Sequence, residues 1–168
     1  MGSLPRESWS VATEAILNAP HAIRNKAHSN CIACGPENRH GLQLEFALAE
    51  DGSVQTTFDC DATYQGFPDI LHGGMVSMLL DGAMTNCLFA HGHDAVTGEL
   101  KIRFRHPVLT NRPATVRAWI ETSSPPYHLL GAQVMQDGQI KARAEGKFVN
   151  RPRHELDKQH PADFRKII

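Results

Sequence analysis

The sequence LHGGMVSMLLDGAMTNCLFA at residues 71–90 predicts a long buried helix, around which the rest of the chain must pack. From Met75 to Ala90, Asp81 is the only residue that is acidic, basic or a histidine. A helix that is apolar on nearly every face is a buried helix. A carboxylate in such a helix must be paired, neutralised by a shifted pKa, or used in chemistry.

The predicted helix begins at Gly73-Gly74, which leaves its first amides open to an incoming group. A helix N-terminus without covering side chains is a ready site for an anion. One element therefore offers both an oxyanion stabiliser and a carboxylate, and this pair indicates acyl-transfer chemistry.

Alternating apolar and polar residues on both sides of this helix predict β-strands. Such alternation marks an antiparallel sheet with one wet face, and the apolar helix covers the dry face. The predicted fold class is therefore α+β. A tight turn at Asp51-Gly52 separates the first two strands, and residues 60–71 are predicted to be a loop. The predicted strands cover residues 42–48, 54–58, 100–105, 116–121, 128–136 and 140–148.

The 168 residues are enough for one domain with a real core. We expect residues 1–41 to hold a short helix at 9–19 and a Cys/His-containing loop, 42–150 to form the main domain, and 151–168 to be a tail.

A formal net charge of -1 gives no field that favours nucleic acid or an anionic membrane. No apolar run is long enough to span a bilayer, and the first residues lack a signal pattern. Four cysteines without an export signal favour a reducing, cytoplasmic location.

The spacing of Gly73 and Asp81 has a consequence for assembly. The two lie eight positions apart, which is about 12 Å along one helix. An oxyanion donor and an acid must both lie within about 3 Å of one reacting carbonyl. If both act, they come from different subunits, which predicts a two-fold dimer with sites at its interface. The pairing of two such dimers into a tetramer is left open.

The stretch YQGFPDILHGGMVSMLLDGAM at residues 64–84, inside this order of strands, resembles the hotdog-fold acyl-CoA thioesterases of the phenylacetic-acid-degradation (PaaI-like) type. The resemblance runs over residues 31–150. It implies a long central helix wrapped by a five- to six-stranded antiparallel sheet. It also implies an enzyme that hydrolyses an acyl-CoA to free acid and CoA, with no cofactor.

The resemblance further implies a role for each matching residue. Asp81 resembles the carboxylate that attacks the thioester or activates a water. Gly73 resembles the residue whose amide polarises the carbonyl, with Gly74 beside it and His72 shaping the turn. Thr97 stands where a hydroxyl positions the attacking water.

The loop before the helix departs from the family. Its members place an Asn or Gln there, but the commonest spacing lands on Gly66, so the neighbouring Gln65 is the candidate. Hotdog dehydratases carry a His just before a Phe-Pro pair, whereas Gly66 precedes Phe67-Pro68 here. Dehydration is therefore the weaker enzymatic interpretation.

Two alternatives to hydrolysis stay open, a hotdog hydratase or dehydratase and a non-catalytic acyl-CoA binding protein. The candidates for contact with the substrate are Arg103 and Arg105, as partners of CoA phosphates, and Phe67.

His28, Cys31, Cys34 and His40 form a possible metal-ligand set in the early loop, and a C-x-x-C pair with histidines can hold zinc. The second half of a usual zinc module is missing and the histidine spacings are irregular. We therefore expect no metal.

Overall fold

The computed structural model describes residues 28–151 of the chain. The helix predicted at residues 9–19 and the tail beyond Arg151 lie outside the described residues. The predicted division at residues 41 and 150 stays a prediction.

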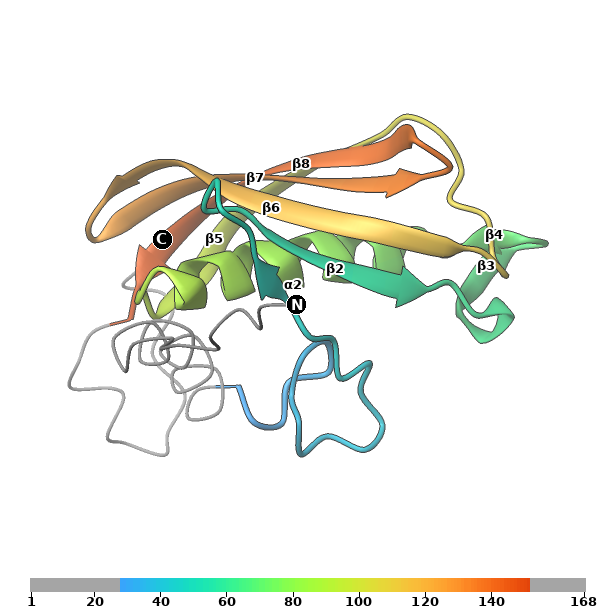
Figure 1. Cartoon of the computed structure of the whole chain (residues 1–168), viewed down its shortest axis with the longest axis horizontal. Coiled ribbons are helices and arrows are strands. Elements are labelled where there is room, and N and C mark those ends of the chain that lie inside the picture. The colour runs from blue at the N-terminus through green and yellow to red at the C-terminus, as the bar shows by residue number, and fades with distance from the viewer. Residues whose placement is uncertain (1–27, 152–168) are drawn as a thin grey trace, which may run out of the picture.

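One long helix, α2 (Gly73–Ala90), lies across one face of a six-stranded antiparallel sheet in the described part of the chain (Figure 1). The order of the strands in the sheet is β1-β2-β6-β7-β8-β5. The predicted α+β class and the hotdog architecture of a central helix wrapped by a sheet are confirmed. The strands are β1 (Ala47–Leu48), β2 (Val54–Asp59), β5 (Ala95–Phe104), β6 (Pro113–Ser124), β7 (Tyr127–Gln136) and β8 (Gln139–Asn150).

The core lies between α2 and the inner face of the sheet. Leu79, Leu80 and Met84 of α2 are fully buried. The facing positions of the sheet alternate along each strand, as its predicted period of two requires. Many of these positions hold a small side chain, which lets the helix lie close to the sheet. They include Ala114, Val116, Ala118, Ala132, Val134, Ala142 and Ala144.

The strand predicted at residues 42–48 is wrong for most of its length, since only Ala47–Leu48 pairs with β2. The amides of Leu42 and Leu44 donate instead to carbonyls of Ile32 and Ala33, at 2.8 and 2.9 Å. The alternating apolar residues are therefore buried against the preceding Cys/His loop and do not form a strand of the sheet.

The segment predicted as a loop at residues 60–71 is more ordered than expected. It contains a short 3₁₀ helix, η1 (Ala62–Tyr64), and a hairpin of β3 (Gln65–Phe67) and β4 (Ile70–Leu71). Strands of two or three residues are too short for a period to show in the sequence. β5 also begins earlier than predicted and has an irregular register between Thr97 and Glu99.

No helix within residues 28–151 has the length and apolar character needed to cross a membrane.

Leu80→Ala tests the buried helix. The side chain is fully buried, so its removal leaves a cavity and should lower the free energy of unfolding by about 2–5 kcal/mol, measured by urea denaturation. Leu48→Ala, at a position 40% exposed on edge strand β1, is the control and should cost much less. An equal loss of unfolding free energy in the two variants would contradict a core centred on α2.

Candidate active site

The N-terminus of α2 presents one open amide. His72 is the N-cap, and its Nδ1 accepts a hydrogen bond of 2.8 Å from the amide of Gly74. The carbonyl of His72 accepts from the amides of Met75 and Val76. Among the hydrogen bonds of residues 28–151, none uses the amide of Gly73. The amide of Gly73 is therefore open to an incoming group, whereas the amide of Gly74 is used by the cap.

This amide borders a pocket of about 570 Å³. The pocket lies between the start of α2, the β3–β4 hairpin and the end of β5. Two aromatic side chains of its lining, Phe67 and Phe104, are 74% and 54% exposed. Arg105 lines both this pocket and a second hollow beside Trp119, whereas Arg103 lines only the second hollow. Of the predicted substrate contacts, the structure therefore brings Phe67 and Arg105 to the pocket.

Asp81 lies near the middle of α2 and is only partly buried. Its Oδ1 accepts a hydrogen bond of 2.7 Å from the hydroxyl of Thr97 on β5. The structure thus brings together the predicted acid and the predicted hydroxyl, sixteen positions apart in the sequence. One hydrogen bond holds the carboxylate in a single orientation while its other oxygen remains for chemistry.

Burial raises the pKa of the Asp81 carboxyl above its ordinary value. The hydrogen bond from Thr97 opposes this rise, the negative Cys31 nearby adds to it, and His28 reduces it. A carboxylate with a raised pKa binds a proton more tightly than usual. Asp81 is therefore suited to accept a proton from a water molecule.

No pattern in the sequence indicated that the Cys/His loop would lie near Asp81. Ala33 of this loop packs on α2 at Gly82, where an added Cβ would come within 3.2 Å of the Ala33 Cβ. His28 makes an edge contact with Phe89, with ring centroids 4.9 Å apart. Hydrogen bonds from the Cys34 and His28 side chains lower the pKa of the Cys31 thiol to about 3.

Gln65 is not brought to the pocket. Its Oε1 accepts from the amide of Asp69 at 3.3 Å, so the side chain closes the β3–β4 hairpin. Gly66 lines the pocket instead and lies against the ring of His72, 3.0 Å from the Cβ that any other residue would add. Sequence reasoning missed Phe104 and His106, which line the pocket because the end of β5 lies beside the helix start.

Gly73 and Asp81 of one chain lie far apart in the structure. Gly73 lines the pocket and Asp81 does not. The eight-residue step between them corresponds to about 12 Å along the continuous helix α2. The two groups of one chain are therefore too far apart to act on the same carbonyl.

Asp81→Asn should change how stability depends on pH. Since the folded-state pKa of Asp81 lies above the unfolded value, this carboxyl contributes stability that is present below the unfolded pKa and is lost as pH rises through the folded pKa. Between about pH 4 and neutrality, wild type should lose stability relative to the variant. Urea unfolding of both proteins at several pH values measures this. A difference that does not vary with pH would contradict the raised pKa.

The family model described as thioesterase superfamily matches residues 69–124, which hold the helix and both proposed groups. Comparison with curated proteins gave no match. Among solved structures, the PaaI protein of the phenylacetic acid degradation operon of E. coli has a TM-score of 0.67 at 19% identity, over 85% of this chain and 97% of that one.

Two further structures share the architecture. A thioesterase superfamily protein has a TM-score of 0.65 at 23% identity, over 87% of this chain and 86% of that one. A Streptococcus mutans protein solved with bound acetyl CoA has a TM-score of 0.60 at 17% identity, over 64% of this chain and 88% of that one. At these identities the structures establish the fold alone. The family match is confined to residues 69–124, and the structures show that this chain has the hotdog fold of these PaaI-like and thioesterase-superfamily proteins.

Proposed function

We propose that this protein is an acyl-CoA thioesterase that works as a two-fold dimer. Each site would combine the Gly73 amide of one subunit with Asp81 of the other. The observation that carries this proposal is one buried helix with an open N-terminal amide and, two turns on, a carboxylate whose pKa is raised.

The reaction needs only water and these two groups. Water adds to the thioester carbonyl, the C–S bond breaks, and the products are the free acid and CoA as a thiol. Negative charge develops on the carbonyl oxygen and is stabilised by the Gly73 amide at the positive end of the helix. A thiolate is a good leaving group, so the departing sulfur needs little help from the protein.

Asp81 acts in one of two ways. As a general base, its carboxylate takes the proton of the attacking water. As a nucleophile, it attacks the carbonyl and forms an anhydride that water then hydrolyses. Both need the ionised form and a fixed orientation, and the hydrogen bond from Thr97 supplies the orientation.

The pocket supports an acyl-CoA as the substrate. Its size, about 570 Å³, lies within the range that takes small organic ligands. Phe67 and Phe104 provide apolar contact for an acyl group, and Arg105 provides a cation for a phosphate. The acetyl CoA bound to the S. mutans protein of the same fold supports this choice of substrate.

The alternatives are less well supported by these residues. A dehydratase needs an acid or base at the position before Phe67, and Gly66 has no side chain. Burial raises the pKa of the Asp81 carboxyl, so keeping this group ionised costs stability. A protein that only binds acyl-CoA gains nothing from such a group.

Asp81→Asn should lower kcat for acyl-CoA hydrolysis by about 10²–10⁴-fold, because the amide can neither take a proton nor attack. Release of CoA thiol from a panel of aryl and aliphatic acyl-CoAs measures this. Asp137→Asn is the matched control, since it removes an exposed carboxylate in the β7–β8 turn. Near-full activity of the Asp81 variant would overturn the assignment.

Gly73→Pro should lower kcat by about 10²–10³-fold, because it deletes the amide donor. Proline suits the first position of a helix, and His72 already has the extended backbone that precedes proline. Gly73→Ala is the control. It keeps the amide, and its Cβ would lie 3.7 Å from Phe104, an ordinary contact. Equal activity of the two variants would exclude Gly73 as the oxyanion donor.

Mixing the two inactive variants tests the shared site. In a mixed dimer, the intact Gly73 of the Asp81→Asn chain meets the intact Asp81 of the Gly73→Pro chain. An equal mixture that exchanges subunits should therefore regain about a quarter of wild-type activity. No gain, with mixed dimers present, would show that one chain supplies both groups.

A further inference from the structure

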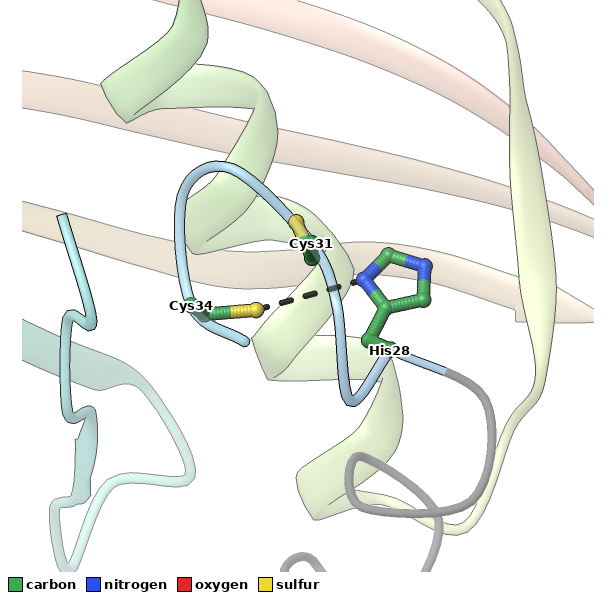
Figure 2. A group of neighbouring side chains, drawn as sticks. All are labelled: His28, Cys31 and Cys34. Atoms are coloured by element: carbon green, nitrogen blue, oxygen red, sulfur yellow. Dashed lines mark hydrogen bonds between the residues drawn. The ribbon is translucent and has the colours of Figure 1, made fainter. Parts of the chain in front are cut away.

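The loop before β1 gathers three metal-ligating side chains beside α2 (Figure 2). The candidate ligand atoms of His28, Cys31 and Cys34 all lie within 4.8 Å of one another. Cys34 is buried, and the other two are partly exposed. None of these atoms belongs to the pocket or to the proposed thioesterase site.

The backbone of this loop is shaped to bring the three side chains together. The amide of Cys31 donates to the carbonyl of His28 at 3.1 Å, and the amide of Gly35 donates to the carbonyl of Cys31 at 2.9 Å. A Cβ at Gly35 would lie 2.4 Å from the Cys31 nitrogen, so only glycine allows this turn. The turn returns Cys34 toward His28, and Figure 2 shows the two side chains facing each other, with Sγ and Nδ1 3.9 Å apart.

Two thiolates and one imidazole are a donor set that zinc prefers. Sulfurs at about 2.3 Å from a tetrahedral zinc lie about 3.8 Å apart. The ligand atoms therefore lie within about 1 Å of the spacing of a zinc site, a difference that rotation of the partly exposed His28 and Cys31 side chains can supply.

We propose that His28, Cys31 and Cys34 bind one Zn²⁺ ion, with the fourth position left to water or another ligand. Both cysteines bind the ion as thiolates, and the neutral imidazole donates its lone pair. The ion cross-links the loop at the point where Ala33 packs on Gly82, next to Asp81.

From the sequence we expected no metal, because half of a usual zinc module is missing. The structure supplies the third ligand from within the same turn, since His28 precedes Cys31 by three residues, as Cys31 precedes Cys34. His40, the other histidine considered, is exposed and lies outside the cluster.

The test measures metal on the full-length protein, purified with reduced thiols and without a histidine tag. Elemental analysis should find about one zinc per chain. After a chelator strips the protein, added Co²⁺ should produce a thiolate-to-cobalt charge-transfer band and the visible bands of a tetrahedral site. Zn²⁺ added afterwards should abolish them.

Cys31→Ser and His28→Ala should lose most of the bound zinc and the charge-transfer band. Cys60→Ser and His40→Ala are matched controls that remove the same residue types outside the cluster, and both should bind metal as wild type does. Circular dichroism of each variant shows that the fold is retained. The cobalt spectrum of wild type does not depend on any variant folding.

Less than about 0.1 zinc per chain, with no cobalt band from the reduced wild type, would overturn the site. A Cys31–Cys34 disulfide that persists under reducing conditions would also overturn it, as would equal zinc in the Cys31 variant and wild type. The readout is metal and not hydrolysis, so the result is independent of the proposed thioesterase activity.

Discussion

The burial of α2 against the six-stranded sheet is the interaction on which the other features of this structure depend. The helix buries its large side chains, such as Leu79, Leu80 and Met84, against an inner face that contains many alanines. Burying a leucine or methionine contributes about 1.5–3 kcal/mol, and small partners let many such contacts form at once. This packing fixes both the position and the rotation of the helix.

Once the helix is fixed, the two groups proposed to act in catalysis are fixed with it. Its first residue, Gly73, opens into the pocket beside the β3–β4 hairpin. Two turns further on, Asp81 meets Thr97 of β5 at a position that remains partly open to solvent. The length of a helical turn keeps the two groups apart within a chain, so the proposed site requires a second chain.

The first strand shows where sequence patterns reach their limit. Leu42, Leu44 and Phe46 alternate with polar residues as a strand would, and Leu44 is indeed buried. Gln43 has a left-handed backbone conformation, with φ 47°, and Leu42 and Leu44 bond to the Cys/His loop. Alternation reports which side chains are buried, but not which backbone supplies the hydrogen-bond partners.

Gln65 and Gly66 show the same limit at the candidate site. A one-residue shift could have brought Gln65 to the reacting carbonyl, but the register of the β3–β4 hairpin directs its side chain to the amide of Asp69. Hairpin register is set by the turn and by strand pairing, and neither can be recognised in a segment of seven residues.

The buried helix, the acid within it and most of the strands could be predicted from the sequence, because hydrophobic periodicity and a lone charge are local properties. The folded structure adds the hydrogen bond from Thr97 to Asp81, the wall of the pocket at the end of β5, and the approach of His28 to Cys31 and Cys34 beside the helix. These contacts depend on the packing of whole elements and on the turn that Gly35 permits. Such packing brings together residues that are far apart in the sequence, and the spacing of residues along the chain does not show which of them will meet.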